Sequence, residues 1–303
     1  MKAIVFPGQG AQYVGMGKSL YESFDEARSI FSQIDAIVGF PLSEKCFLGP
    51  KEDLTDTSIQ QLAILATSVA AFEVFKQRNI PVAYLSGLSL GEYTCLYAAE
   101  VLPLKDLVFL VKERAAGMQL ASELNPSTML AVIGIKKPRL EELGSRYNFY
   151  LANFNAPGQV VISLKRDAKS TIKKILESEG ARVVELAVSG GFHSPFMEQA
   201  KQRLTMAIDR VELRTAKIPI VSNYTGLPAH RKEELRKNLL EQLTSAVLWK
   251  DCVEHIISGG VDTFFEIGPS KVLRGLMRKI APQVRVINCE KSQDFDQMKL
   301  CVH

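Results

Sequence analysis

The fold around the strongest candidate for a reactive side chain is set by one stretch of sequence, Pro81-Val-Ala-Tyr-Leu-Ser-Gly-Leu-Ser-Leu-Gly-Glu92. It predicts a short apolar strand, a tight turn at Ser89 and then a helix. Gly87 and Gly91 lack a Cβ atom, so the chain can turn sharply and present the Ser89 hydroxyl above the end of a sheet. The free N–H groups at the start of the following helix would lie beside it. The pattern indicates a nucleophile with an oxyanion site, and an ordinary turn with a capping serine is the alternative.

On both sides of this turn, predicted strands alternate with predicted helices, which favours a parallel sheet covered on both faces. The predicted strands of this sheet lie at residues 3–6, 84–87, 218–221, 263–266 and 284–287. The predicted helices lie at residues 17–38, 59–77, 91–99, 104–120, 195–208, 231–243, 249–258 and 271–280.

The pattern changes after residue 124. Strands are predicted at 128–134, 149–152, 160–164 and 182–188, and helices at 137–145 and 167–179, with residues 153–158 as a turn. The order β-α-β-β-α-β is that of a ferredoxin-like unit. We therefore expect a large α/β domain, similar to that of the α/β-hydrolases, formed by residues 1–124 and 191–303. An inserted ferredoxin-like α+β subdomain would span residues 125–190.

Composition limits the possible functions. The chain has 303 residues, of which 47% are hydrophobic and 23% charged, with a formal net charge of +4. This charge is too small to indicate nucleic-acid binding, and we expect none. We expect no signal peptide and no segment that is apolar enough, for long enough, to span a membrane. Five scattered cysteines, with no C-x-x-C pair, indicate reduced thiols and a cytoplasmic protein. They are Cys46, Cys95, Cys252, Cys289 and Cys301.

A nucleophilic serine needs a base, and the chain has only four histidines: His193, His230, His255 and His303. His193 lies between a predicted strand and a predicted helix, in Ser189-Gly-Gly-Phe-His-Ser-Pro195. Such a loop can deliver a side chain to the rim of a sheet. A surface histidine with no chemical role is the alternative. His303 is the last residue, and His255 lies in a helical stretch where a packed histidine is the default.

Two further features could bind a substrate. The turn Gly8-Gln9-Gly10 follows the first strand and would let backbone N–H groups approach a ligand, although its spacing is not that of a dinucleotide site. Arg114 lies on a helix followed by the small residues 115–117, and a guanidinium inside a pocket suits two-point binding of a carboxylate. A solvated arginine is the alternative.

Five segments occur in one order along the chain: Phe6-Pro-Gly-Gln-Gly-Ala-Gln12, Gly87-Leu-Ser-Leu-Gly-Glu92, Arg114 with Met118-Gln119, Gly191-Phe-His-Ser-Pro-Phe-Met197 and Glu266-Ile-Gly-Pro-Ser-Lys-Val-Leu273. Together they resemble the malonyl-CoA:acyl carrier protein transacylases, the enzymes that load malonyl units for fatty acid and polyketide synthesis. The resemblance covers nearly the whole chain, and the set is far more specific than any single motif.

The resemblance implies a role for each matching residue. Ser89 matches the acylated serine and His193 its general base. The histidine would be oriented by the backbone carbonyl of Gln242 in place of an aspartate. The backbone N–H groups of Gln9 and Leu90 match the oxyanion hole.

The resemblance also implies the substrate contacts. Arg114 matches the arginine that pairs with the malonyl carboxylate, and Met118, Phe192 and Asn155 match positions around the acyl group, with Gln159 beside them. One position departs from the family pattern. The residue before the nucleophile is usually histidine and here is Leu88, which removes a polar neighbour of the substrate and bears on malonyl selectivity.

The implied activity is transfer of a malonyl group from malonyl-CoA to the phosphopantetheine thiol of acyl carrier protein, through a malonyl-serine intermediate. We expect no metal and no cofactor, a monomer, and acyl carrier protein as the macromolecular partner. Basic residues that could meet this acidic partner are Lys271, Arg274, Arg278 and Lys279. The alternatives are an editing acyl hydrolase or thioesterase, a transacylase of altered acyl selectivity, and a docking subunit without activity.

Overall fold

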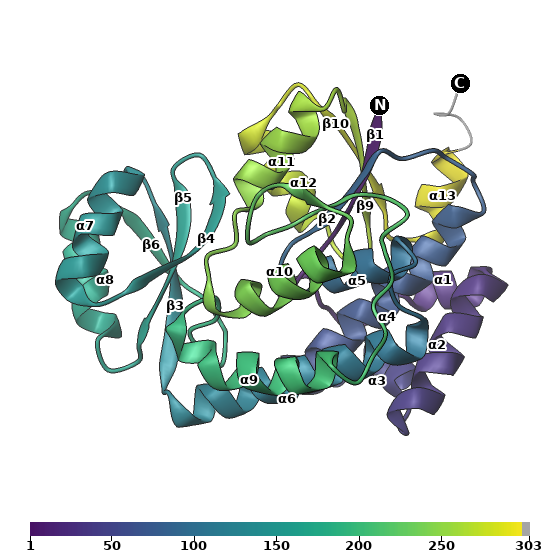
Figure 1. Cartoon of the computed structure of the whole chain (residues 1–303), viewed down its shortest axis with the longest axis horizontal. Coiled ribbons are helices and arrows are strands. Elements are labelled where there is room, and N and C mark those ends of the chain that lie inside the picture. The colour runs from purple at the N-terminus through teal and green to yellow at the C-terminus, as the bar shows by residue number, and fades with distance from the viewer. Residues whose placement is uncertain (299–303) are drawn as a thin grey trace.

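The computed structural model describes residues 1–298 and contains two sheets, one in each part of the molecule (Figure 1). Cys301 and His303, for which the sequence predicts a reduced thiol and a terminal side chain, lie outside the described residues. The larger part carries a six-stranded sheet and the smaller part a four-stranded one. The predicted mixed α/β architecture is confirmed.

The six-stranded sheet has the strand order β10-β9-β1-β2-β7-β8. Its strands are β1 (Lys2–Phe6), β2 (Tyr84–Gly87), β7 (Ile220–Val221), β8 (Pro228–Ala229), β9 (Thr263–Ile267) and β10 (Arg285–Cys289). All neighbours pair in parallel except β7 and β8. The carboxyl ends of β1, β2 and β9 therefore meet at one edge, where ligands bind in open α/β sheets.

Alternation along the strands buries both faces of this sheet. On β1, Ile4 and Phe6 pack into the core that faces α2, α4 and α6, while Ala3 and Val5 pack against α11 and α12. The helices of this part are α1 (Lys18–Ser23), α2 (Asp25–Val38), α3 (Leu42–Leu48), α4 (Thr57–Lys76), α5 (Gly91–Ala98), α6 (Leu104–Leu124), α9 (Glu198–Ile208), α10 (Lys232–Thr244), α11 (Trp249–Ser258), α12 (Val272–Ile280) and α13 (Ser292–Met298). The sequence did not predict α3, α13, β8 or the short 3₁₀ helix Lys51–Thr55.

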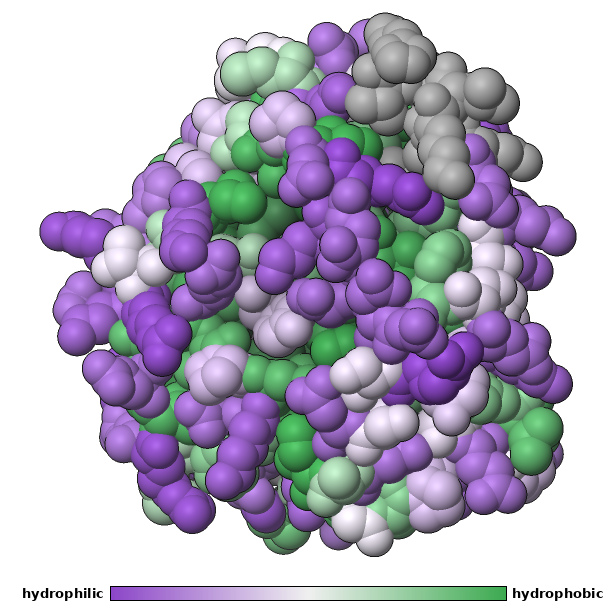
Figure 2. Space-filling model, turned by 90° about the vertical axis from the view of Figure 1, so that its right-hand side faces the viewer, coloured by the Kyte–Doolittle hydropathy of each residue, from purple (hydrophilic) through white to green (hydrophobic). Residues whose placement is uncertain are grey.

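One expectation about membranes is wrong. By length and composition α4 could cross a membrane, since it has a window of mean hydropathy 1.4. That window is 83% buried inside the protein, and α4 is the central helix of the larger core. Its apolar residues thus pack against protein. Figure 2 shows one face of the molecule, on which hydrophilic side chains cover most of the surface and apolar ones lie between them.

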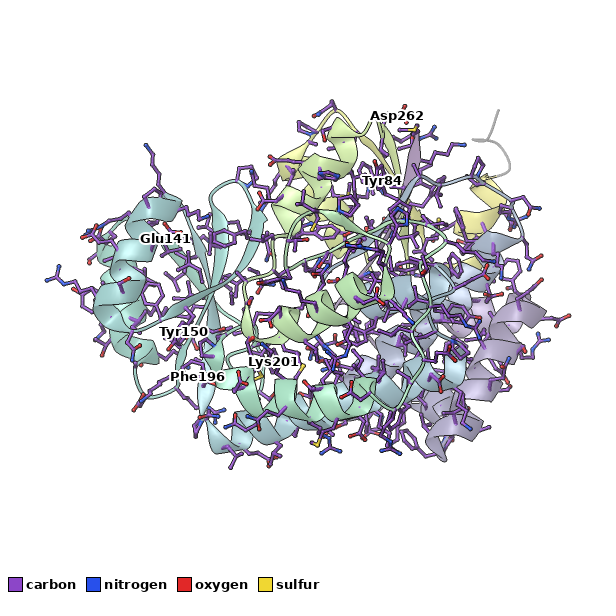
Figure 3. The ribbon with its side chains drawn as sticks, viewed as in Figure 1. Tyr84, Glu141, Tyr150, Phe196, Lys201 and Asp262 are labelled. Carbon is purple, nitrogen blue, oxygen red and sulfur yellow. The ribbon has the colours of Figure 1, made fainter. Side chains whose placement is uncertain are left out.

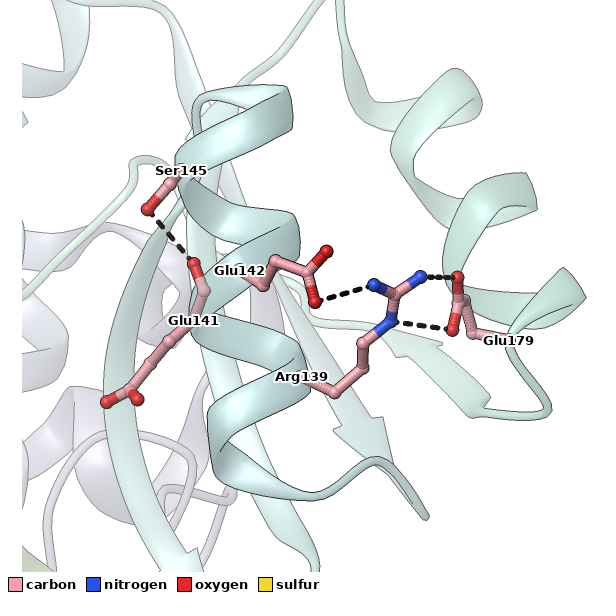
Figure 4. Close-up of polar contacts among 5 residues, drawn as sticks. All are labelled: Arg139, Glu141, Glu142, Ser145 and Glu179. Atoms are coloured by element: carbon pink, nitrogen blue, oxygen red, sulfur yellow. Dashed lines mark hydrogen bonds and ion pairs between the residues drawn. The ribbon is translucent and has the colours of Figure 1, made fainter.

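The four-stranded sheet has the order β4-β5-β3-β6 and is antiparallel throughout. It comprises β3 (Ser127–Ile133), β4 (Tyr150–Ala156), β5 (Gln159–Lys165) and β6 (Arg182–Glu185), covered by α7 (Lys137–Tyr147) and α8 (Lys169–Ser178). The predicted β-α-β-β-α-β order is confirmed. Arg139 on α7 pairs with Glu142 and with Glu179, the residue that ends α8, and so ties the two helices together (Figure 4).

The predicted turn at residues 153–158 is wrong. β4 continues to Ala156, and only Pro157 and Gly158 turn. The physical reason is a second partner on the other edge of β4, because the N–H of Phe154 donates to the oxygen of Val247 at 2.9 Å and the N–H of Val247 donates to Ala152 at 2.8 Å. The smaller sheet is thereby joined to the larger part of the molecule.

The chain passes between the two parts at α6–β3 and again after β6 (Figure 1). The rings of Tyr150 on β4 and Phe196, just after His193, meet edge to face at 5.4 Å (Figure 3). We propose that the inserted subdomain spans residues 125–190.

Candidate active site

The turn at the end of β2 places Ser89 as the sequence predicts. Ser89 has a φ of 52°, a left-handed conformation that is strained for a residue with a side chain. The flanking glycines permit close approach: a Cβ atom on Gly91 would lie 2.1 Å from the oxygen of Phe6, and one on Gly87 would lie 2.1 Å from the carbonyl carbon of Gly91. The helix α5 begins at Gly91, two residues after the serine, with Leu90 as its N-cap.

A base lies directly beside this hydroxyl. Ser89 Oγ is 2.8 Å from Nε2 of His193, and Nδ1 of His193 is 2.8 Å from the main-chain oxygen of Gln242. A carbonyl oxygen can only accept, so Nδ1 carries the proton and Nε2 is left free to accept the serine proton. The geometry is that of a serine–histidine pair oriented by a peptide carbonyl. The other described histidines lie elsewhere; His255, for example, packs against Tyr84.

Arg114 is fully buried and points at the same hydroxyl. Its Nη2 donates to Ser89 Oγ at 2.9 Å, and its Nη1 donates to Oε1 of Gln61 at 2.6 Å. The guanidinium also lies over the ring of Tyr93, 5.1 Å from its centre. The small residues after Arg114 let α6 pack closely against α9, because a Cβ atom on Gly117 would lie only 3.1 Å from the Cα of Ala200 on α9.

The two predicted oxyanion donors lie at the ends of neighbouring strands. Gln9 follows β1, and Leu90 follows the serine. Among the described residues, neither backbone N–H has a hydrogen-bond acceptor, whereas the N–H of Ser89 donates to Oδ1 of Asn223 at 2.6 Å. The side chain of Gln9 is tied to Oε1 of Gln60 at 2.6 Å. The turn at residues 87–91, the elbow, therefore leaves the N–H of Leu90 available to a ligand.

Of the predicted substrate contacts, Met118 shares a hydrogen-bond partner with Arg114. Met118 is fully buried, and its sulfur accepts from Nε2 of Gln61, the residue that also holds Arg114. Phe192 is buried, and its carbonyl oxygen accepts from Ser163 Oγ at 2.6 Å. Leu88 is half-buried and packs on the core beneath the elbow. Asn155 lies on β4, and its Oδ1 is buried without a protein partner.

Gln159, by contrast, lies at the start of β5 and accepts at 3.0 Å from Nζ of Lys279.

Three polar residues of the site were not predicted as functional: Gln61, Glu92 and Asn223. Asn223 donates to the carbonyl of Gly87 at 2.8 Å and accepts from Ser89 N, so it bridges both sides of the elbow. Oε2 of Glu92 accepts from Nε2 of Gln242 at 2.6 Å and from the N–H of Asn223 at 3.1 Å. Glu92 is the last residue of the elbow motif, and an acidic residue in an otherwise apolar helix was a signal that could have identified it.

Burial sets the charge states at this site. It lowers the pKa of His193 to about 4, an effect that Arg114 reinforces and the carbonyl of Gln242 opposes. The histidine is therefore neutral near pH 7, as a base must be before it accepts a proton. Burial also lowers the pKa of Arg114, which stays charged, and raises that of Glu92 to about 7. Within the described residues no three His, Cys, Asp or Glu side chains are grouped to hold a metal ion.

The cysteines behave as packed thiols. Cys46, Cys95 and Cys252 are buried and form no disulfide, and burial raises the pKa of the Cys95 thiol well above its usual value. Sγ of Cys95 donates to the carbonyl of Gly91, on its own helix, at 3.4 Å. It does not take part in the site.

Comparison with known proteins identifies the family. Residues 3–291 match the acyl transferase domain model. The chain is 37% identical over 291 residues to a malonyl CoA-acyl carrier protein transacylase of Bacillus subtilis, covering 94% of this chain and 92% of the relative. The crystal structure of a malonyl CoA-acyl carrier protein transacylase from Clostridium perfringens superposes with a TM-score of 0.95, at 31% identity, over 99% of this chain and 96% of that one.

A further solved structure is a type II PKS acyl-carrier protein in complex with its malonyl-transacylase, which matches with a TM-score of 0.94 at 31% identity over 98% of both chains. These matches extend across both sheets and every segment that holds the serine, the histidine and the arginine. The chain belongs to the acyl transferase domain family and, within it, to the malonyl CoA-acyl carrier protein transacylases.

Proposed function

We propose that this protein transfers the malonyl group of malonyl-CoA to the phosphopantetheine thiol of acyl carrier protein, with Ser89 as the residue that carries it. The observation that supports this most directly is the contact of one hydroxyl with two groups of different function. Ser89 Oγ lies 2.8 Å from the base His193 and 2.9 Å from the carboxylate-binding group Arg114. A hydrolase of simple esters would not require the carboxylate-binding arginine.

The first half of the reaction acylates the serine. His193 accepts the proton of Ser89 Oγ at Nε2 while the oxygen attacks the thioester carbonyl of malonyl-CoA. The oxyanion that forms would accept hydrogen bonds from the N–H groups of Gln9 and Leu90, each worth on the order of 3 kcal/mol in comparable sites. The C–S bond then breaks, the proton passes from His193 to the CoA thiolate, and malonyl-O-Ser89 remains.

The second half reverses these steps with another thiol. The phosphopantetheine thiol of the carrier gives its proton to His193 and attacks the ester carbonyl, and the same two N–H groups hold the oxyanion. When the C–O bond breaks, the proton returns to Ser89 Oγ. No proton is gained or lost at the reacting atoms over the cycle. Neither half requires a metal or a cofactor, and we propose that the enzyme uses none.

Selectivity for malonyl would come from Arg114. A malonyl carboxylate pairs with this buried guanidinium, whereas an acetyl group leaves the cation without an anion. Phe192 and Met118 would border the acyl group, and Asn155, whose Oδ1 has no protein partner among the described residues, would accept a hydrogen bond from the substrate.

The alternatives are less well supported. A thioesterase of the α/β-hydrolase type would orient its histidine through a carboxylate, but His193 contacts the carbonyl of Gln242. An editing hydrolase would have no need of a buried arginine at the nucleophile. A docking subunit without activity would not require a hydroxyl and an imidazole 2.8 Å apart. The one feature that supports altered acyl selectivity is Leu88, which replaces the usual histidine.

The docking surface for the carrier is proposed on α12. The basic residues predicted for this role lie on or beside this helix, which begins at the edge of the sheet where the active site lies. A groove of about 550 Å³ is lined by residues of α12 and β10, among them Lys271, Arg274, Arg278 and Arg285. Carrier proteins are acidic, so this groove complements them. We further propose a monomer in the cytoplasm, with no nucleic-acid or membrane partner.

Intact-mass measurement after mixing the protein with malonyl-CoA tests the proposal. We expect one malonyl adduct on the wild-type chain, none on Ser89→Ala, and loss of the adduct when carrier protein is added. Gln33→Ala, an exposed change on α2, serves as a control that should acylate normally. An adduct that persists on Ser89→Ala, or one that carrier protein does not remove but water does, would refute the transfer reaction.

A further inference from the structure

The active site contains a buried charge imbalance. Arg114 has no exposed surface, and within the described residues its hydrogen-bond partners, Gln61, Ser89 and Gln242, are all uncharged. A buried cation without a counter-charge is costly, usually by several kcal/mol. In the proposed reaction the malonyl carboxylate supplies that counter-charge, but only while the acyl group is present. Something must offset the cation in the free enzyme.

Glu92 is connected to Arg114 through one amide. Nη2 of Arg114 lies 3.4 Å from Oε1 of Gln242, and Nε2 of the same amide donates to Oε2 of Glu92 at 2.6 Å. The amide thus presents its negative end to the cation and its positive end to the carboxylate. The remaining Nε2 hydrogen of Gln242 donates to the carbonyl of Ser89 at 3.1 Å. Glu92 is 2% exposed, so water does not screen this arrangement.

Among the described residues that interact with Glu92, no other side chain supplies a negative charge that could balance Arg114. The titratable side chains that act on it electrostatically are Tyr93, Cys95, Cys252 and Arg114. Burial raises the pKa of Tyr93 to about 12 and those of the two thiols above their usual values, so all three are neutral at pH 7. His193 is neutral there as well. Arg114 and the ionised fraction of Glu92 are therefore the charges in this group of side chains.

We propose that Glu92 is the resident counter-ion of Arg114 and that loading a malonyl group on Ser89 drives a proton from solvent onto the Glu92 carboxylate. Malonyl loading brings a second negative charge to the guanidinium. Two carboxylates then share one cation in a medium of low dielectric, and the less directly paired one becomes protonated. The inference rests on the proposed function, since it requires a malonyl-enzyme.

The added proton comes from the buffer. For each Glu92 that is ionised before loading, one proton leaves the buffer and forms an O–H bond on the carboxylate, which offsets the negative charge that the malonyl group brings. Burial raises the pKa of Glu92 to about 7, against the lowering effect of hydrogen bonds from Asn223 and Gln242, so even a modest further rise protonates it near neutral pH. An acetyl group carries no charge and should leave Glu92 as it is.

Calorimetry of a single round of acylation, without carrier protein, tests this at pH 7 in two buffers of different ionisation enthalpy. With malonyl-CoA we expect the wild-type enzyme to take up a measurable fraction of a proton per acyl group, and Glu92→Gln to take up none. Both proteins release the same CoA thiol, so that contribution cancels. Glu266→Gln removes another buried carboxylate with a raised pKa, one that caps α12, and should retain the uptake.

A second readout is acyl preference. Glu92→Gln keeps an oxygen that can accept from Gln242 but removes the charge, so the free enzyme should bind an anionic acyl group more strongly. We expect the ratio of kcat/KM for malonyl-CoA to that for acetyl-CoA to rise roughly threefold to tenfold. If Glu92 only supported the fold, its substitution would lower kcat/KM for malonyl-CoA and for acetyl-CoA together and leave their ratio unchanged.

The proposal is overturned if the wild-type enzyme takes up no proton on malonyl loading, a measurement that needs no variant. Equal uptake by wild type and Glu92→Gln, or an unchanged ratio between the two acyl groups, would also overturn it. Each of these results leaves the malonyl adduct on Ser89 in place. Failure of the proposed function appears instead as absence of that adduct by mass.

Discussion

The main-chain oxygen of Gln242 lies 2.8 Å from Nδ1 of His193, while the side chain of the same glutamine donates to the carbonyl of Ser89 at 3.1 Å. One residue thus holds both the base and the nucleophile. The carbonyl fixes the imidazole tautomer, and the amide braces a serine in a strained conformation. Because the contact with the base is made by the backbone, no side-chain substitution at position 242 removes it directly.

Gln242→Ala should therefore separate the two roles. The carbonyl remains, but the hydrogen bonds to Ser89 and Glu92 are lost, which leaves buried polar groups without partners at a cost of about 1–3 kcal/mol each. We expect the acylation rate to fall roughly tenfold to a hundredfold while KM for malonyl-CoA changes little. Stopped-flow acylation measures this, with Gln33→Ala as the exposed control. An unchanged rate would show that the amide does not brace the serine.

The depressed pKa of His193 predicts a pH dependence of stability. In the unfolded chain histidine has a pKa of about 6.5, and in the folded protein burial lowers it to about 4. Below pH 6.5 the unfolded state therefore binds more protons, so stability is lost as the pH falls from about 6.5 toward 4. The total loss is on the order of 3 kcal/mol.

Measurement of this dependence requires a comparison of variants, because Glu92 and Glu266 have raised pKa values and act in the opposite direction. Urea unfolding of the wild type and of His193→Gln at several pH values isolates the histidine. The difference in unfolding free energy between the two proteins should fall with decreasing pH in this window. A difference independent of pH would mean that the histidine is not held neutral in the folded state.

The sequence predicted most of the helices and strands well, and it did so where local chemistry decides structure. The glycines around Ser89 and the alternation of strands and helices are local signals. β4 was cut short because Asn, Pro and Gly in residues 153–158 favour a turn, whereas pairing with Val247 extends the strand. Glu92 and Asn223 were missed because their partners lie about 130 to 150 residues away, in contacts that only the fold creates.

Charge reversal on α12 tests the docking surface. Arg278 is exposed and lines the groove beside β10, so Arg278→Glu should repel an acidic carrier. We expect KM for the carrier to rise roughly fivefold or more, with the largest effect at low ionic strength, while acylation by malonyl-CoA is unchanged. Lys105→Glu, an exposed change at the start of α6, is the control for net charge. Equal effects of the two variants would place the docking site elsewhere.

Leu88→His restores the residue that the family usually has before the nucleophile. Leu88 is half-buried and packs on the core that contains Val247 and Trp249, so a polar ring there should cost about 1–2 kcal/mol of stability. It would also place a hydrogen-bonding group next to Ser89, and we expect the preference for malonyl-CoA over acetyl-CoA, in kcat/KM, to rise at least roughly threefold. Leu88→Met, which keeps volume and polarity, should leave that preference unchanged. If both variants shift the preference equally, packing beneath the elbow controls selectivity and the hydrogen-bonding capacity of position 88 does not.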